Sequence, residues 1–231
     1  MTERIGIIGA MEEEVTTLIA ALEDRAEQTI GRVVYHTGKL GGKDVVVAKC
    51  GVGKVNAALT AAEMIRTFFA TVLINTGVAG ALEGSLSPED AVIATDLVQH
   101  DYDTSPLGDE PGFVSGPETV RFPTDPAVTQ AAVDAARALG MRVLQGTVAS
   151  GDQFISSQAQ KKRIKRLFGA YACEMEGAAI AHACYLFGVK CAVIRTISDR
   201  ADGEAQIDFP TFATHAAALN AEIVKRVVAS L

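Results

Sequence analysis

Short apolar runs alternate along the chain with longer segments whose apolar positions recur at helical spacing. The short runs predict strands at Ile5–Ala10, Val33–Thr37, Val45–Cys50, Thr71–Thr76, Ala91–Val98, Val143–Ser150, Ala170–Cys173 and Val189–Ser198. Most of these runs are apolar at successive positions rather than at alternate ones, so both faces of each strand are expected to be buried. A sheet of this kind needs helices on both sides.

The longer periodic segments supply those helices. They are expected at Glu13–Asp24, Lys54–Phe69, Asp125–Leu139, Gln158–Leu167, Glu176–Phe187 and Pro210–Ser230. The alternation of strands and helices defines an α/β protein, and we predict a three-layer αβα sandwich around a central sheet. The stretch Gln99–Phe122 has little periodicity and is rich in proline and glycine, so a long functional or interfacial loop is expected there.

Size and composition narrow the class of protein. The 231 residues suit one domain, expected to span residues 1–231. A net charge of −7 opposes binding to a phosphate backbone, so nucleic acid is not expected as a partner. No apolar run reaches the roughly 18 residues of a membrane helix, and the N-terminus lacks a secretory pattern, which predicts a cytoplasmic protein without membrane contact. The four cysteines show no C-x-x-C pair and are expected to be reduced and buried.

Three short motifs suggest cofactors but lack residues that those cofactors need. Gly6-Ile7-Ile8-Gly9 lacks the third glycine of a dinucleotide fingerprint. Gly51-Val52-Gly53-Lys54 lacks both the first glycine of a phosphate loop and the Ser or Thr after its lysine. His100-Asp101-Tyr102-Asp103 has no second histidine nearby, which favours a polar strand end over a metal site. We therefore expect no metal and no cofactor.

Acidic residues follow directly after three of the predicted strands. They are Glu12–Glu14 after the first strand, Glu174 and Glu176 after the seventh, and Asp199 after the eighth. In open α/β sheets ligands bind at the carboxyl ends of the strands, so these carboxyl groups are expected to converge in one crevice. The preference of acidic residues for the first turn of a helix explains part of Glu12–Glu14 without any function.

Converging carboxyl groups suit the cleavage of a glycosidic bond. One carboxyl group protonates the leaving group, another activates water, and together they stabilise the cationic transition state. Acids that lie close together also raise one another's pKa, so that one of them stays protonated near neutral pH. Gly77 and Gly80 follow the strand Thr71–Thr76 and either let a flat substrate approach the backbone or simply mark a turn.

Five ordered motifs, spread from Ile5 to the last helix, resemble those of bacterial methylthioadenosine/S-adenosylhomocysteine nucleosidases. They are Gly6-Ile7-Ile8-Gly9-Ala10-Met11-Glu12-Glu13-Glu14-Val15, Asn75-Thr76-Gly77-Val78-Ala79-Gly80, Ser150-Gly151-Asp152-Gln153-Phe154-Ile155, Glu174-Met175-Glu176 and Arg195-Thr196-Ile197-Ser198-Asp199. The resemblance implies a nucleoside phosphorylase-like fold with a mixed central sheet and a homodimer. It also implies hydrolysis of the N-glycosidic bond of 5′-methylthioadenosine, S-adenosylhomocysteine and related 5′-substituted adenosines, with release of adenine.

The resemblance also implies roles for individual residues. Asp199 resembles the general acid that protonates adenine, and Glu14 resembles the base that orients water. The implied substrate contacts are Glu176 and Met175 at the ribose, Phe154 stacked on adenine, the Ile155 backbone at the adenine edge, Met11, Val52 and Phe209 around the 5′ substituent, and Val78, Glu174 and Ser198 elsewhere in the site. A loop near Phe113 is expected to close the pocket of the partner subunit.

Other functions remain open at this point. The stretch Leu97-Val98-Gln99-His100-Asp101 also resembles nucleosidases that accept aminodeoxyfutalosine. A purine nucleoside phosphorylase is the second alternative, although phosphate needs cationic donors where this chain has Met11–Glu14, Asn75 and Val78. A catalytically silent nucleoside-binding module is the third, although it has no need of both an acid and a base.

Overall fold

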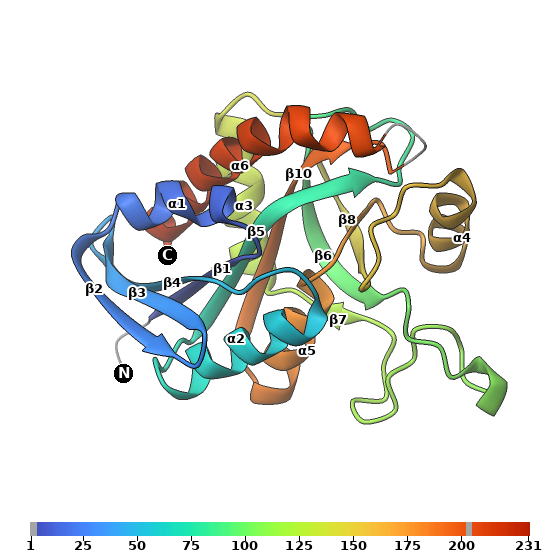
Figure 1. Cartoon of the computed structure of the whole chain (residues 1–231), viewed down its shortest axis with the longest axis horizontal. Coiled ribbons are helices and arrows are strands. Elements are labelled where there is room, and N and C mark those ends of the chain that lie inside the picture. The colour runs from blue at the N-terminus through green and yellow to red at the C-terminus, as the bar shows by residue number, and fades with distance from the viewer. Residues whose placement is uncertain (1–3, 202–204) are drawn as a thin grey trace.

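The computed structural model describes residues 4–201 and 205–231, except the side chains of 205–211 (Figure 1). The elements, in chain order, are β1 (Ile5–Gly9), α1 (Glu12–Ala20), β2 (Glu23–Ile30), β3 (Val33–Leu40), β4 (Lys43–Lys49), α2 (Lys54–Arg66), β5 (Val72–Ala81), β6 (Ala91–Gln99), the 3₁₀ turn η1 (Ser105–Leu107), β7 (Phe122–Pro123), α3 (Pro126–Ala138), β8 (Val143–Ser150), α4 (Gln158–Phe168), β9 (Ala172–Glu174), α5 (Gly177–Phe187), β10 (Lys190–Asp199) and α6 (Ala205–Ser230).

The strands form one mixed sheet in the order β10-β6-β8-β9-β5-β1-β4-β3-β2. β1 pairs in parallel with β4 and β5, whereas β9 runs antiparallel to β5 and β10 runs antiparallel to β6. β10 also pairs in parallel with β5, so the strands β5, β9, β8, β6 and β10 close on themselves at one end of the sheet. The α/β class and the mixed sheet are confirmed; the apolar pattern did not predict this closure.

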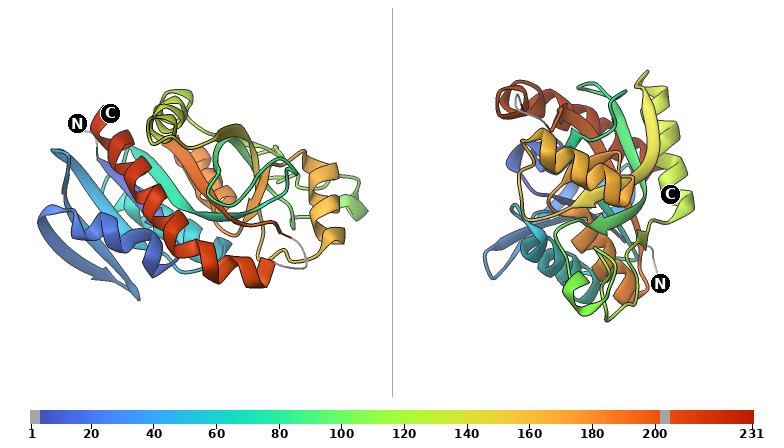
Figure 2. Two further views of the ribbon diagram at one scale, coloured as in Figure 1. Left: turned by 90° about the horizontal axis from the view of Figure 1, so that it is seen from above. Right: turned by 90° about the vertical axis from the view of Figure 1, so that its right-hand side faces the viewer.

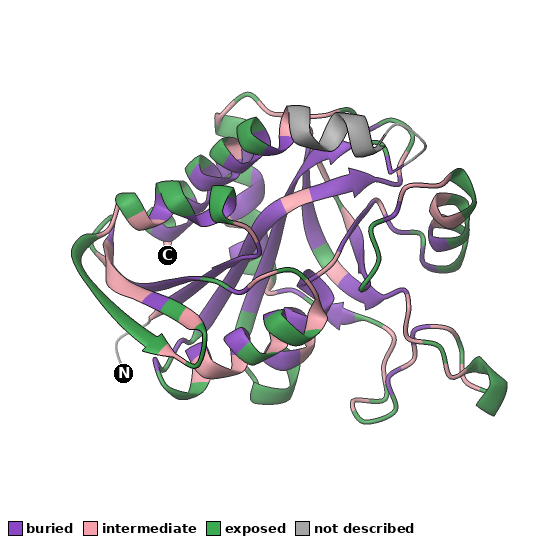
Figure 3. Ribbon diagram, in the orientation of Figure 1, coloured by how far each residue is buried: buried purple, intermediate pink, exposed green. Residues whose placement is uncertain are grey.

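Helices cover both faces of the sheet (Figures 1 and 2). α1, α3 and α6 pack on one face, and α2 and α5 pack together on the other. Successive side chains of a strand point to opposite faces of the sheet. In β1, Ile5 and Ile7 pack in the core under α1, α3 and α6, whereas Ile8 packs in the core under α2 and α5. Figure 3 shows the resulting buried strands between partly exposed helices.

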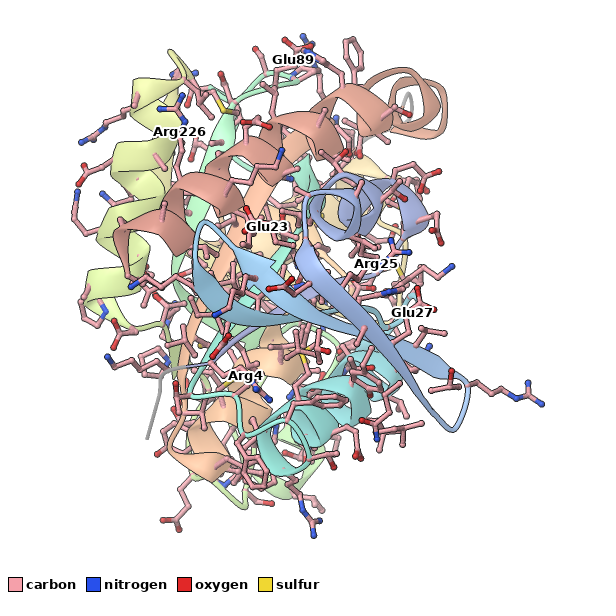
Figure 4. All side chains as sticks on the ribbon, turned by 90° about the vertical axis from the view of Figure 1, so that its left-hand side faces the viewer. Arg4, Glu23, Arg25, Glu27, Glu89 and Arg226 are labelled. Carbon is pink, nitrogen blue, oxygen red and sulfur yellow. The ribbon has the colours of Figure 1, made fainter. Side chains whose placement is uncertain are left out.

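The predicted element that is wrong lies at the outer edge of the sheet. The predicted helix Glu13–Asp24 ends at Ala20, and Glu23–Ile30 forms the edge strand β2 instead. This strand carries exposed polar residues, among them Glu23, Arg25 and Glu27, which project from it in Figure 4. An edge strand without an apolar face has no period-two signal, and its charges protect it from pairing with other chains.

The long predicted loop is confirmed. Between β6 and β7 the chain forms only η1 and an isolated bridge between Val114 and Thr119. This loop extends away from the body of the protein in Figure 1. None of the helices in the described part of the chain is both long enough and apolar enough to span a membrane. The four cysteines are free and buried, as predicted.

Candidate active site

A cavity of about 280 Å³ opens where the ends of β1, β5, β9 and β10 meet. It is lined by Ala10, Met11, Glu14, Val52, Val78, Ala79, Gly80, Gln153, Phe154, Ile155, Cys173, Glu174, Met175, Glu176, Ser198 and Asp199. All the predicted site residues are in this lining except Phe209, whose side chain lies outside the described residues. The carboxyl groups therefore converge, as expected. The sheet differs from the open parallel sheet used for that expectation, because β9 runs antiparallel to β5.

Glu14 is held in the cavity by backbone amides that follow β1 and by one within β5. Its Oε2 accepts hydrogen bonds from the amides of Ala10 (2.6 Å) and Met11 (3.0 Å), and its Oε1 accepts one from the amide of Val78 (3.1 Å). Burial raises the pKa of Glu14 above its ordinary value, although the charge of Arg195 and these amides oppose the shift. A fixed carboxylate with a raised pKa has the properties of a general base.

Asp199 ends β10 on another wall of the cavity and is also buried. Its Oδ2 accepts a hydrogen bond from the Ser198 hydroxyl (2.9 Å), and its Oδ1 accepts one from the amide of Ala201 (2.8 Å). The two carboxyl groups expected to perform the chemistry thus line one cavity, Glu14 from the first turn of α1 and Asp199 from the end of β10.

The glycines of β5 make room for these carboxyl groups. A Cβ atom on Gly77 would lie 2.6 Å from Oε1 of Glu14, and one on Gly80 would lie 2.9 Å from Oδ1 of Asp199. Both glycines lie inside the strand, which continues to Ala81, so the predicted turn there is wrong. At these two positions the missing side chains leave room for the carboxyl groups of Glu14 and Asp199.

Glu174 is engaged with protein groups on both of its oxygens. Arg195 Nη2 donates to Oε2 at 2.5 Å, the amides of Glu176 (3.0 Å) and Gly177 (2.7 Å) donate to the same oxygen, and the Ser150 hydroxyl donates to Oε1. Burial alone would raise the pKa of Glu174, but the charge and hydrogen bond of Arg195 outweigh it and hold the pKa below its ordinary value. Glu174 is therefore the ionised partner of Arg195.

Arg195 is a residue of the site that our assignment of roles missed. Its side chain is almost completely buried, and it also bonds to the Asn75 side chain and to the carbonyl of Ile194 (3.0 Å). Its positive charge opposes the rise in the pKa of Glu14 and Glu176. The available signal was an arginine inside an otherwise apolar strand, because a buried charge needs a partner.

Glu176 has a different environment from its neighbour Glu174. Its Oε1 accepts a hydrogen bond from the amide of Gly53 (2.8 Å), in the loop between β4 and α2. Burial, followed by the negative charge of Glu174, raises the pKa of Glu176 to about 8. At neutral pH this carboxyl group is mainly protonated, so it can donate a hydrogen bond as well as accept one.

The remaining wall of the cavity is apolar and partly open. Met11, Met175 and Val78 are half-buried and Ile155 is buried, whereas Val52 is 49% exposed and Phe154 is 45% exposed. Among the described residues, no group of three or more His, Cys, Asp or Glu side chains is placed to hold a metal ion. The site thus combines a hydrophobic surface with buried acids, as pockets for small organic molecules commonly do.

Comparison with known proteins places this cavity in an enzyme family. The sequence model of the phosphorylase superfamily matches residues 4–229. A 5′-methylthioadenosine/S-adenosylhomocysteine nucleosidase of Staphylococcus aureus is 40% identical over 229 residues, covering 98% of this chain and all of that protein. An aminodeoxyfutalosine nucleosidase of Campylobacter jejuni is 37% identical over 228 residues, covering 99% of both chains.

A solved structure shows the same fold with a ligand. The 5′-methylthioadenosine/S-adenosylhomocysteine nucleosidase of Neisseria meningitidis, crystallised with methylthio-immucillin-A, matches with a TM-score of 0.96 and 40% identity, covering 99% of this chain and 100% of that chain. The chain therefore belongs to the phosphorylase superfamily. Within it the chain groups with nucleosidases, which hydrolyse N-glycosidic bonds; the predicted fold and enzyme class are confirmed.

Proposed function

We propose that the protein hydrolyses the N-glycosidic bond of 5′-methylthioadenosine, S-adenosylhomocysteine and related 5′-substituted adenosines, releasing adenine. The observation that carries this proposal is the presence of two buried carboxyl groups, Glu14 and Asp199, in one cavity with an apolar wall. The substrates are those in the names of the relatives from Staphylococcus aureus and Neisseria meningitidis, which are 40% identical to this chain.

Glu14 acts as the general base that positions and deprotonates the attacking water. The amides of Ala10, Met11 and Val78 converge on its carboxylate. In a phosphorylase, groups of this kind would be available to bind phosphate, because backbone amides that point to one spot form an anion site. Here an internal carboxylate occupies that spot, and its charge opposes a second anion. Water is therefore the nucleophile.

Asp199 acts as the general acid that protonates adenine as the bond breaks. The hydrogen bonds from the Ser198 hydroxyl and the Ala201 amide hold its carboxyl group in place. Negative charge on Glu14 and on Glu174 stabilises the oxocarbenium-like transition state. The Arg195 guanidinium keeps Glu174 ionised for this purpose.

The other lining residues bind the substrate. Glu176 and Met175 contact the ribose. The protonated carboxyl group of Glu176 can both donate hydrogen bonds to the ribose hydroxyls and accept them. Phe154 stacks on adenine while the Ile155 backbone binds its edge. Val78 contributes apolar surface, while its amide holds Glu14. Met11, Val52 and Phe209 surround the 5′ substituent.

The protein works as a homodimer in this proposal. Val55 is 68% exposed and Leu59 is 66% exposed, on one face of α2 immediately beyond Val52 at the open side of the cavity. A second copy would cover this apolar face, and the loop near its Phe113 would close the pocket. We also propose that the chain acts as one domain, because the family match spans 4–229, and that it works in the cytoplasm, because its cysteines are free thiols.

Aminodeoxyfutalosine is the alternative substrate. The Campylobacter jejuni relative named for it is 37% identical over the whole chain, so the two substrates have nearly equal support from similarity. The wall at Val52, which is 49% exposed, is partly open and leaves room for a 5′ substituent larger than methylthio.

Adenine release from a panel of nucleosides tests the proposal. We expect cleavage of 5′-methylthioadenosine and S-adenosylhomocysteine, with tighter binding of methylthioadenosine than of adenosine, because each buried methylene contributes roughly 0.8 kcal/mol. Light scattering should give twice the mass of one chain. Cleavage of aminodeoxyfutalosine alone would select the alternative, and a fully active monomer would contradict the shared pocket.

A further inference from the structure

Two sequence segments that lack a complete cofactor motif, Gly51-Val52-Gly53-Lys54 and His100-Asp101, meet beside the cavity. Lys54 Nζ lies 2.6 Å from Asp101 Oδ1 and donates to the side-chain oxygen of Gln99 at 3.1 Å. The Lys54 and Asp101 side chains are 16% and 17% exposed, which is less than most of the ion pairs on this protein. The pair connects the first residue of α2 to the loop after β6.

A third segment completes the connection. The amide of Asp152, after β8, donates to Asp101 Oδ2 at 2.8 Å, and the amide of Lys54 donates to Asp152 Oδ1 at 2.8 Å. Lys54, Asp101 and Asp152 thus form a closed ring of three hydrogen-bonded contacts, called here the Lys54 ring. Glycine is required where the loops touch: a Cβ atom on Gly151 would lie 2.4 Å from His100 Nε2.

The Lys54 ring is adjacent in sequence to Gly53, whose amide contacts Glu176 in the site. Gly53 directly precedes Lys54, adopts a left-handed φ of 104°, and donates its amide to Glu176 Oε1 at 2.8 Å. The direction of the Gly53 N–H depends on the contacts that hold Gly53 and its neighbours. The Val52 carbonyl accepts a hydrogen bond from the Asn56 side chain (2.7 Å), and the Gly53 carbonyl accepts one from the Ala57 amide (3.1 Å). The ring holds Lys54 at both the backbone amide and the side-chain ammonium.

We propose that Lys54 and Asp101 are positioning residues that aim the Gly53 amide at Glu176 and so set the carboxyl group that binds the ribose. This inference rests on the proposed function of Glu176 but concerns residues that do not line the cavity. The Asp152 side chain alone is sufficient to cap the N-terminus of α2. Helix capping therefore does not explain why the Lys54 ammonium is paired with Asp101. Stability is a weak explanation as well, because a partly buried ion pair gains little over its desolvation cost.

The first experiment needs no catalysis. Hydrogen–deuterium exchange is measured by mass spectrometry on peptides covering 50–57 and 150–156 in the wild type, in Lys54→Met and in the isosteric Asp101→Asn. Both variants should exchange faster than the wild type in these peptides and equally elsewhere. Lys39→Met is the matched control, because it removes an ammonium from the Lys39–Asp44 pair (3.2 Å) at the opposite end of β4. Unchanged exchange in both ring variants overturns the proposal.

The second experiment asks whether the effect passes through Glu176. Each ring variant should lose roughly 10- to 100-fold in kcat/KM for 5′-methylthioadenosine, as expected for a displaced binding group, and Lys39→Met should lose none. In a Glu176→Ala background, which removes the acceptor of the Gly53 amide, Lys54→Met should add less than about a 3-fold loss. Additive losses overturn the proposal.

The two proposals fail differently. If the wild type cleaves no nucleoside, the proposed function is wrong, and the exchange experiment alone decides on the Lys54 ring. If the wild type is active and the ring variants match it in rate and in exchange, the ring proposal is wrong and the proposed function stands.

Discussion

A methyl group at position 77 should displace the general base, Glu14, without changing its chemical identity. In Gly77→Ala, the new Cβ would lie 2.6 Å from Glu14 Oε1, 3.1 Å from Glu14 Cδ and 3.4 Å from Arg195 Nη1. The nearest atoms all belong to the ends of flexible side chains, so the strand β5 can persist while the Glu14 carboxylate moves.

The size of the effect follows from the contacts. Ordinary contact begins at about 3.4 Å, so the carboxylate must move by about 0.8 Å. Its bond to the Val78 amide is already 3.1 Å long and would exceed hydrogen-bonding distance after such a shift. Losing one hydrogen bond to a charged group costs about 2 kcal/mol, which corresponds to about a 30-fold loss in kcat/KM.

The assay is steady-state adenine release by Gly77→Ala, with Gly84→Ala as the control. A Cβ on Gly84 meets nothing within 4 Å, so this variant should keep wild-type kinetics. Thermal unfolding of both variants separates loss of the base position from loss of the fold. Wild-type kcat/KM in a folded Gly77→Ala protein would refute the reasoning, because the base would then tolerate a shift or lie elsewhere.

Three further variants test the roles of individual acids. Asp199→Asn should abolish adenine release while the far-ultraviolet circular dichroism is unchanged, because an amide cannot donate the proton; near wild-type turnover would exclude Asp199 as the acid. Glu14→Gln should bind nucleoside in calorimetry with little change but lose hydrolysis, and lost binding with normal chemistry at saturation would oppose its role as the base. Glu176 has a pKa raised from 4.5 to about 8 in the folded protein, so its contribution to stability is complete below pH 4.5 and is lost as the pH rises through 8. The melting temperature of Glu176→Gln relative to the wild type should therefore increase between pH 5 and pH 9, and a constant difference would show that Glu176 is not buried as described.

The buried strands and most helices were predictable because their apolar residues must face a core. β8 has its predicted bounds, and β10 differs by one residue at each end. β2 was not predictable from hydrophobicity, since an exposed edge strand stabilised by pairing to β3 shows no apolar alternation. The closure of β10 onto β5 depends on contacts between segments far apart in the chain, which local patterns do not encode.

The residues of the candidate site could be predicted from the sequence, but their partners and protonation states could not. The motifs located the carboxyl groups, but the sequence could not show that Arg195 holds Glu174 ionised or that Glu176 keeps a proton. Those properties come from burial and from distances between strands. The Lys54 ring was not predicted for a similar reason. Its two motifs are separated by 46 positions, and each of them alone resembles an incomplete cofactor motif.

The central claim is that water, activated by Glu14, cleaves the N-glycosidic bond of a 5′-substituted adenosine. The most direct test incubates the protein with 5′-methylthioadenosine, with and without inorganic phosphate, and identifies the products by chromatography and by ³¹P NMR. We predict free adenine and free 5-methylthioribose at the same rate in both reactions, with no phosphate consumed. Formation of a sugar 1-phosphate, a rate that depends on phosphate, or no adenine at all would contradict the account.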